Sequence, residues 1–434
     1  MWMIRLLQQP FNAASLGRSA LIALICGSLI LLFSLGIRHG FGLFLKPITV
    51  DQGWTRESFA FAIALQNLLW GISQPFVGVL ADKYGSPRIV LAGTLLYAAG
   101  LWLMASSADE MSFIIGAGVL IGLGLAGTTF PVILATISRL VPPQYQSISM
   151  GIATSVGSFG QFIMLPVSLG LLSWLDWQGA LIALSMLALL MAPLAYGLSY
   201  GLNYGLGSEM KLGAISATTA PPLGEAPPAE ISSLKAVKEA LAARDFWLLS
   251  FGFFACGFQV VFIAVHLPAF LADEGLAPHV ATTVLALIGL LNVFGTYYAG
   301  VWGGRYRKPM LLSWVYLLRG LLIAAFILLP ITNYSAYTFG ILMGLFWLST
   351  VPLTSGTVAA VWGVKHMSML GGIVFFWHQL GSFIGGWLGG YLYDTTGSYD
   401  IVWLLAIGFS FLSAILNWPI KESLVQAGTR KVAP

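Results

Sequence analysis

A short charged stretch reads Gly78-Val79-Leu80-Ala81-Asp82-Lys83-Tyr84-Gly85-Ser86-Pro87-Arg88 and stands between two long apolar runs. Residues 58–80 before it and residues 89–108 after it contain no charged side chain. Each run is long enough to cross a hydrocarbon core of about 30 Å as a helix, because a helix rises about 1.5 Å per residue. The stretch therefore predicts a tight hairpin at one face of a membrane.

The composition of the whole chain agrees with a membrane location. The chain has 434 residues, of which 58% are hydrophobic and 8% are charged, and its mean hydropathy is +0.87. A soluble domain is about a quarter charged, so we expect a polytopic membrane protein. The two cysteines, Cys26 and Cys256, each lie in an apolar run, which predicts neither a disulfide framework nor a metal site. The chain carries no phosphate-binding loop and no zinc-protease pattern, so we expect no enzyme activity, no catalytic residue and no cofactor.

Apolar runs predict twelve helices, with boundaries uncertain by a few residues. The predicted ranges are 19–45, 56–81, 88–107, 111–140, 145–172, 178–200, 246–272, 279–303, 310–330, 335–360, 367–393 and 399–419. We interpret the first run as an uncleaved helix rather than a signal peptide, because it is too long for one and leads into further spans. Four prolines between residues 221 and 228, together with Ser, Thr and mixed charges, are typical of a linker. We therefore expect six helices in residues 1–200, a linker at 201–244, and six helices in residues 245–434.

Basic residues predict the orientation of these spans. Sixteen Lys and Arg residues fall on the side of the two termini and the linker, whereas Lys46 and Arg56 alone fall on the other side. Cytoplasmic loops carry the excess of Lys and Arg, so both termini and the linker are expected to be cytoplasmic. A bacterial inner membrane is the expected location.

The charged hairpin also resembles a known family. Gly78 and Gly85 permit close helix approach and a left-handed turn, Pro87 begins the next helix, and Asp82 can cap that helix or pair with Arg88. Gly78, Leu80, Ala81, Asp82, Gly85 and Arg88 are similar to the loop 2–3 signature of the major facilitator superfamily. The resemblance implies an all-α membrane protein of two six-helix bundles. It also implies that Gly78, Asp82, Gly85 and Arg88 act in gating.

The two halves of the chain look like a repeat. Gly78 and Pro87 recur as Gly300 and Pro309 at an offset of 222 residues. Pro131 recurs as Pro352 at an offset of 221, which predicts a kinked fourth helix in each half. Gly304 stands where the second hairpin should carry its Asp, so we expect the lock made by Asp82 to operate mainly in the N-terminal half.

Arg38 is the first candidate for substrate binding. It follows Arg18 by 20 residues, about 30 Å along a helix, and six more apolar or small residues separate it from the next charge. Charged side chains within spans are costly and mark functional sites, and a guanidinium matches a carboxylate bidentately. We favour a cation that receives an anionic substrate; the alternative is an Arg that extends to the membrane interface.

Further polar residues within spans are secondary candidates. His378 lies near mid-depth in the eleventh helix, and His266 lies toward the outer end of the seventh; each could bind substrate or pack against a neighbouring helix. Gln66, Asn67 and Asn292 could line a cavity, although hydrogen bonding between helices is the alternative for each. Arg319 lies at mid-depth in the ninth helix, where a structural pairing is favoured.

The acidic residues limit how transport could be driven. All 16 fall in predicted loops or helix ends, so no buried carboxylate is available as a proton carrier. A histidine or the substrate's own carboxyl group is then the remaining carrier, if protons move.

The fifth helix resembles a branch of the superfamily. Tyr145, Ser149, Gly151, Ala153, Ser155 and Gly160 are similar to the small-residue spacing of monocarboxylate transporters, although Gln146 and Ser147 replace the basic residues that normally follow the Tyr. Residues of the drug-antiporter pattern are absent: Gly118 stands in place of its Arg, and 156–160 contain no proline. The chain most resembles bacterial monocarboxylate-transporter-like proteins and oxalate–formate antiporters.

These observations predict a secondary transporter of a small organic anion, a mono- or dicarboxylate, that works by rocker-switch alternating access. Its expected partners are the substrate and the lipid bilayer, with protons as a candidate co-substrate; we expect a monomer that binds no metal and no nucleic acid. One alternative is an efflux carrier for hydrophobic or drug-like compounds. Another is a membrane sensor or scaffold that transports nothing.

Overall fold

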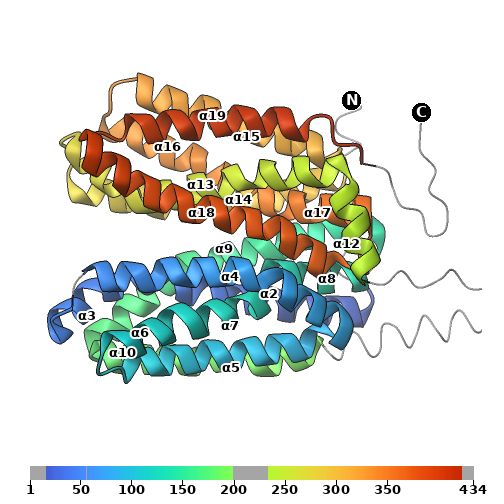
Figure 1. The fold of residues 1–434 in the computed structure, drawn as a ribbon, viewed down its shortest axis with the longest axis horizontal. Coiled ribbons are helices and arrows are strands. Elements are labelled where there is room, and N and C mark those ends of the chain that lie inside the picture. Colours follow the sequence, from blue (N-terminus) through green and yellow to red (C-terminus); the bar gives the residue numbers. More distant parts are fainter. Residues whose placement is uncertain (1–15, 55, 199–232, 423–434) are drawn as a thin grey trace, which may run out of the picture.

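A computed structural model describes residues 16–54, 56–198 and 233–422, and within them every regular element is a helix (Figure 1). The N-terminal elements are α2 (Arg18–His39), η2 (Gly40–Phe44), α3 (Leu45–Gln52), α4 (Arg56–Tyr84), α5 (Ser86–Ala105), α6 (Glu110–Ile114), η3 (Ile115–Leu120), α7 (Ile121–Thr128), α8 (Phe130–Leu140), α9 (Pro143–Trp174) and α10 (Trp177–Leu189). The C-terminal elements are α12 (Ser233–Ala242), α13 (Arg244–Asp273), α14 (Pro278–Gly303), α15 (Lys308–Leu328), α16 (Asn333–Phe346), α17 (Thr350–Trp362), α18 (Met367–Thr396) and α19 (Asp400–Asn417).

Twelve helical stretches of the described chain are long and apolar enough to cross a membrane. They are Arg18–Phe44, Phe61–Tyr84, Ser86–Ala105, Glu110–Leu140, Pro143–Trp174, Trp177–Leu198, Arg244–Pro268, His279–Gly303, Lys308–Leu328, Asn333–Trp362, Met367–Tyr393 and Asp400–Asn417. Each overlaps one of the twelve ranges expected from hydropathy, so that prediction is confirmed.

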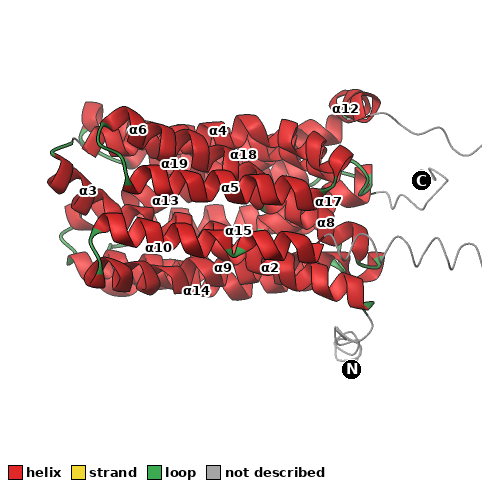
Figure 2. Cartoon of the chain, turned by 90° about the horizontal axis from the view of Figure 1, so that it is seen from below, coloured by secondary structure: helices red, strands yellow, loops and turns green. Residues whose placement is uncertain are grey.

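The helices form two bundles that run side by side. Figure 1 shows α2 to α10 in the lower bundle and α13 to α19 in the upper one, and Figure 2 shows the long helices lying along one common direction. The expected linker contains the short helix α12 at one end of the molecule, and residues 199–232 lie outside the described residues.

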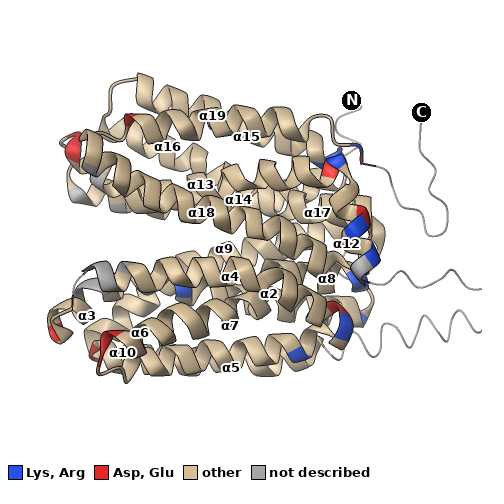
Figure 3. Cartoon of the chain, viewed as in Figure 1, with Lys and Arg blue, Asp and Glu red and all other residues tan. Residues whose placement is uncertain are grey.

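Charged side chains lie mainly at the two ends of the bundles and are scarce between them (Figure 3). We call the end that carries α12 the basic end. It holds Arg18, Lys83, Arg88, Arg139, Arg305, Arg307, Lys308, Lys365 and Lys421. The opposite end holds acidic residues such as Asp51, Asp109, Asp176, Glu274 and Asp400.

The fourth span of each bundle is broken, as the matching prolines Pro131 and Pro352 predicted. In the first bundle, Thr129 has an extended conformation between α7 and α8, and a π-helical turn, η3, precedes α7. In the second, residues 347–349 form a turn between α16 and α17. The prediction of a kinked fourth helix in both halves is confirmed.

The two bundles pack against each other from the basic end to mid-depth. Helix α4 packs on α18, and α9 packs on α14. A Cβ placed on Gly151 would lie 2.6 Å from the Cα of Gly300, so only glycine permits this approach. Farther along the same helices, the hydroxyl groups of Ser155 and Thr296 lie 2.9 Å apart.

Among the described residues, no hydrogen bond joins the two bundles between mid-depth and the opposite end. The last such bond from the basic end joins Asn292 Nδ2 to Ser158 Oγ at 2.9 Å, and both residues lie near the middle of their helices. The described chain is therefore closed at its basic end and held together only as far as mid-depth.

Candidate functional site

The closure at the basic end centres on the carboxylate of Asp82, in the last turn of α4. One carboxylate oxygen forms an ion pair with Arg139 of α8, and the other accepts a 2.9 Å hydrogen bond from the backbone N–H of Met369. Met369 lies in the first turn of α18, so the carboxylate also interacts favourably with the positive end of that helix dipole.

Arg139 extends this contact to the other bundle. Its Nε donates to the carbonyl of Val364 at 2.9 Å, and an Nη donates to the carbonyl of Lys365 at 3.1 Å. Asp82 and Arg139 therefore join α4 and α8 of one bundle to the start of α18 in the other. Arg88, the partner considered from the sequence, is exposed and makes no ion pair in the described part of the chain.

The two glycines of the hairpin meet different requirements. A Cβ on Gly78 would collide with the backbone carbonyl of Ser368, so glycine allows α4 and α18 to touch. Gly85 has φ of 90°, a conformation that favours glycine, and it joins α4 to α5.

Arg38 lies in the last turn of α2 and points to the side chains of α4 rather than to a helix end. Its Nε donates to Gln66 Oε1 at 3.0 Å, and its Nη2 donates to Asn67 Oδ1 at 2.5 Å. The guanidinium carbon also lies 5.2 Å from the ring centroid of Trp70, a cation–π contact. The structure thus brings together three of the six predicted binding residues, Arg38, Gln66 and Asn67.

The two amide groups are fixed in the orientation that suits a cation. Gln66 donates its amide to the carbonyl of Ala117 at 2.7 Å, within the π-helical turn η3, and Asn67 donates to the carbonyl of Ile63 at 3.0 Å. Because these N–H groups are used by the backbone, both amide oxygens remain available to Arg38. The broken fourth span therefore helps to position the cation.

Arg38 has no acidic partner among the described residues. The ion pairs of the described chain are Asp82–Arg139 and Lys308–Glu422, and both lie at the basic end. Nη1 of Arg38 has no acceptor within the described chain, and Arg38 is only partly buried. A charge within a membrane protein is costly without a partner, so this guanidinium can accept a further anion.

Arg319 differs from Arg38 because it donates to two backbone carbonyls as well as to an amide oxygen, although its Nε has no partner among the described residues. It is fully buried and donates to Gln259 Oε1 at 3.0 Å and to the carbonyls of Phe346 and Trp347 at 2.6 and 2.5 Å. Those carbonyls lie at the C-terminal end of α16, where the helix dipole is negative. This placement fits the structural role that was expected for Arg319.

Aromatic rings connect Arg38 to His378 in the other bundle. The ring of Trp70 lies 5.1 Å from Phe375, which stacks on His378 at 5.2 Å with an interplanar angle of 8°. Phe253 of α13 lies 4.7 Å from the same imidazole. Arg38 and His378 therefore flank one aromatic contact between the bundles.

His378 is 7% exposed and lies where α18 packs on α13. Its Nδ1 lies 3.2 Å from Gln379 Oε1, which can only accept, so this nitrogen carries the proton. Its Nε2 is buried and has no partner among the described residues.

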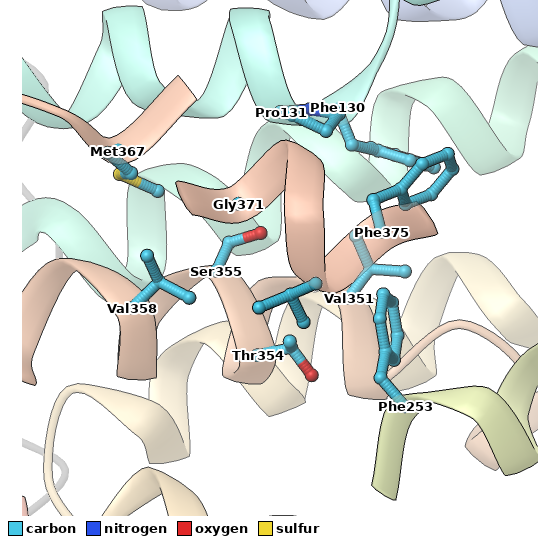
Figure 4. A pocket seen from close by; sticks show the side chains of 11 residues that line it. Phe130, Pro131, Phe253, Val351, Thr354, Ser355, Val358, Met367, Gly371 and Phe375 are labelled. Carbon is cyan, nitrogen blue, oxygen red and sulfur yellow. The ribbon is translucent and has the colours of Figure 1, made fainter. Parts of the chain in front are cut away.

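A small cavity of about 20 Å³ lies between the two bundles, next to the same aromatic rings (Figure 4). Figure 4 shows Phe253 and Phe375 at one side of it and Met367 at the other, with Ser355 between them. The broken fourth spans contribute Phe130 and Pro131 from α8 and Val351, Thr354, Ser355 and Val358 from α17. The volume is enough for about one water molecule, so the contact between the bundles is nearly complete here.

His266 and Asn292 lie apart from Arg38. His266 Nε2 donates to the carbonyl of Gly386 at 2.8 Å, and its ring packs against Phe262 and Tyr399. Gly386 follows His378 by eight residues, about 12 Å along α18 toward the opposite end.

Asn292 joins helices and lies far from any free cation. It donates to Ser158 and accepts a 3.0 Å hydrogen bond from the backbone N–H of Leu348, in the break between α16 and α17. It is fully buried, so its polar atoms serve the contact between α9 and α14 and the broken tenth span.

Two residues of this site were not singled out from the sequence. Trp70 does not stand out in the sequence, because aromatic side chains are abundant, at 13% of the chain. Trp70 follows Asn67 by three residues and Gln66 by four. Residues at these spacings share a helix face, and this was the sequence signal that could have identified Trp70 as part of the site. Arg139 was counted only for orientation, although it is the one basic residue in the last turn of the fourth span.

Comparisons with known proteins agree on one family. Residues 24–386 match the sequence profile of the Major Facilitator Superfamily, and residues 249–426 match it again. The chain is 24% identical over 406 residues to the uncharacterized MFS-type transporter YcxA of Bacillus subtilis (strain 168), covering 89% of this chain and 92% of that protein. It is 25% identical to human monocarboxylate transporter 11, covering 86% of this chain and 77% of that one. It is 27% identical to monocarboxylate transporter 13 of Bos taurus, covering 86% and 83%.

Solved structures show the same fold. The crystal structure of the MFS transporter FucP in the outward conformation superimposes with a TM-score of 0.62 at 18% identity, covering 92% of this chain and 99% of FucP.

Proposed function

Because the chain belongs to the Major Facilitator Superfamily, we propose that it carries a small organic anion across the membrane by alternating access, with Arg38 as the cation that receives a carboxylate. The observation that carries this proposal is the unpaired guanidinium of Arg38, which two fixed amide oxygens and Trp70 position within the bundle. The monocarboxylate transporters among its relatives support the same substrate class.

The chemistry of the site favours a carboxylate over a neutral ligand. Amide oxygens satisfy two donors of Arg38 but supply no negative charge, whereas a carboxylate supplies charge and a bidentate geometry. Nη1 and the neighbouring Nη2 form the edge of the guanidinium that such a ligand would meet.

His378 supplies a second contact from the other bundle in this proposal. When its Nε2 is protonated it can donate to the same anion, so a bound substrate would bridge α2 and α18. Binding that engages both bundles favours closure around the substrate. The acidic residues of the described chain lie at helix ends and in loops, so none of them competes with the substrate for Arg38.

The structure corresponds in this proposal to the outward-facing state. The basic end is assigned to the cytoplasm by the excess of Lys and Arg, with a bacterial inner membrane as the location. Asp82 and Arg139 then hold the cytoplasmic side closed, with Gly78 and Gly85 shaping the hairpin. Residues 1–200 and 245–434 rock as two bodies joined by residues 201–244, and the hydrogen bonds of Arg139 to residues 364 and 365 break as the inward-facing state forms.

The test compares wild-type protein with Arg38→Gln in reconstituted vesicles and in a thermal-shift screen of organic acids. Hydrogen bonds to a charged group contribute about 1.5–3 kcal/mol, so loss of the guanidinium should weaken carboxylate binding roughly 100-fold. Arg18→Gln is the matched control, because Arg18 lies on the same helix but is exposed at the basic end. Carboxylate transport at the wild-type rate by Arg38→Gln would refute the proposal.

The second candidate is efflux of a hydrophobic compound, which the rings of Trp70, Phe253 and Phe375 favour. Lipophilic cations should then stabilise the protein in the thermal-shift screen, and Phe375→Ala should abolish transport while Arg38→Gln preserves it. Absence of any flux in vesicles, with all of these ligands, would point instead to a sensor or scaffold.

A further inference from the structure

An apolar groove lies on the outside of the C-terminal bundle, between α15 and α19 and far from Arg38. Its volume is about 370 Å³, and its lining consists of Ser313, Trp314, Leu317, Phe411, Ala414, Ile415 and Trp418. For comparison, an engineered apolar cavity of about 150 Å³ binds benzene. The side chains of Trp314, Ile415 and Trp418 are among the most exposed large apolar groups of the two helices, so the groove faces the lipid.

The start of α15 and the end of α19, which border the groove, lie at the basic end. Trp314 follows Lys308, the first residue of α15, by six residues, which is about 9 Å along the helix. Trp418 directly follows the last residue of α19. Tryptophans prefer the level of the lipid headgroups, so the groove opens at the interface and extends into one leaflet.

Basic residues precede α15 and follow α19, the two helices that line the groove. Arg305, Arg307 and Lys421 are exposed, and the fourth cation there, Lys308, is neutralised by its ion pair with Glu422. Arg307 also donates to the carbonyl of Ile420, two residues after Trp418, which holds its guanidinium beside the groove.

Negative charge near these two helix ends is smaller than positive charge. Glu422 is occupied by Lys308, and Asp245 of α13 accepts a hydrogen bond from the backbone N–H of Lys421. Four cations therefore face two carboxylates, and three of the cations form no ion pair with a described residue.

We propose that this groove is a binding site for an anionic phospholipid, with one acyl chain between α15 and α19 and the phosphate at Arg307 and Lys421. The apolar groove lies at the depth of the acyl chains, and the cations of the basic end lie at the depth of the headgroups. A phospholipid would therefore meet apolar surface with its chain and positive charge with its phosphate. A second copy of the chain fits this face less well, because a symmetric contact would place the exposed cations of both copies together.

The test uses quenching of tryptophan fluorescence by brominated lipids in nanodiscs that contain the full-length protein. Subtracting the signal of a Trp314→Phe/Trp418→Phe variant isolates the two groove tryptophans from the other 13. Brominated phosphatidylglycerol should quench them at a lower mole fraction than brominated phosphatidylcholine does. Two cations contribute about fivefold each near an anionic surface, so the expected preference is about 30-fold.

Two controls make the result specific. Arg307→Gln/Lys421→Gln should remove most of the preference, whereas Arg18→Gln/Lys83→Gln, which removes two charges from the same end of the N-terminal bundle, should keep it. Trp102 of α5, which is also exposed, should be quenched equally by both lipids when isolated by Trp102→Phe.

Equal quenching of the groove tryptophans by both lipids would overturn the proposal. Loss of quenching of the groove tryptophans under conditions in which sedimentation shows a dimer would also overturn it, because the groove would then be covered by a second copy of the chain. Neither result depends on the transport substrate, so failure here is distinguishable from failure of the carboxylate proposal.

Discussion

Replacing Asp82 by Asn should open the basic end of the protein. The carboxylate forms an ion pair with Arg139 and accepts the N–H of Met369, and its side chain is only 3% exposed. Asn keeps an oxygen for Met369 but loses the charge that Arg139 and the start of α18 require. Hydrogen bonds between charged groups contribute about 1.5–3 kcal/mol, so we expect the closed state to lose about 2 kcal/mol. This corresponds to a shift of roughly 30-fold in the equilibrium between closed and open states.

Ser355 offers a position at which to measure this shift. It lines the small cavity behind the closed contact (Figure 4), so a cysteine at this position should react with a polar maleimide only when the basic end opens. With Cys26 and Cys256 replaced by alanine, Ser355→Cys should be labelled roughly 30-fold faster in the Asp82→Asn protein, provided that opening and closing are faster than labelling.

Two further variants decide which partner matters. Arg139→Gln should accelerate labelling about as much as Asp82→Asn, and the double variant should add little, because both remove the same ion pair. Arg88→Gln should leave the rate unchanged, since Arg88 is exposed. An unchanged rate in Asp82→Asn, or an effect of Arg88→Gln equal to that of Arg139→Gln, would refute the reasoning.

Three other predictions concern single positions. Gly300→Ala should also speed labelling of the cysteine at 355, because its Cβ would collide with Gly151 and destabilise the closed state by about 1–3 kcal/mol. Labelling at the rate of the protein with Gly300 would show that α9 and α14 can separate locally. Arg319→Met should lower stability by about 1–3 kcal/mol, read as a fall in the thermal midpoint, because Gln259 and two buried carbonyls lose their donor; a midpoint equal to that of the wild type would contradict this role. His378→Ala should lower the rate of carboxylate uptake, because it removes the proposed contact from α18, and uptake at the wild-type rate would remove His378 from the transport step.

Much of the fold followed from the sequence because the bilayer restricts what a chain can do. Backbone groups in lipid must be satisfied within a helix, so hydropathy alone locates the spans. The breaks in the fourth and tenth spans were also predictable, since Pro131 and Pro352 remove a backbone donor at matching places. The π-helical turn η3 was not, because it carries no proline and only Gly116 and Gly118 mark it.

The candidate site was less predictable, because its contacts join residues far apart in the chain. Asp82 was considered with Arg88, six residues away, whereas its partner Arg139 lies 57 residues away on another helix. Arg38, Gln66 and Asn67 were each proposed separately, and only the hydrogen bonds from Arg38 of α2 to the side chains of α4 show that they form one group. His266 had the same residue type and a similar apolar setting as His378, but the sequence cannot show that Gly386 already accepts its proton.

The contact at the basic end has a consequence for how this protein tolerates mutation. On the C-terminal side, Asp82 binds a backbone N–H and Arg139 binds two backbone carbonyls, so residues 364, 365 and 369 contribute through their main chain. Proline at 369 should therefore be lost in a saturation screen because it lacks the N–H, whereas other apolar side chains that fill the buried position of Met369 should be tolerated. Selection acts on Asp82 and Arg139 in one half and largely on backbone shape in the other, where the hydroxyl of Ser368 also lies 3.4 Å from Arg139. The two halves can therefore diverge in sequence while the closed state is preserved.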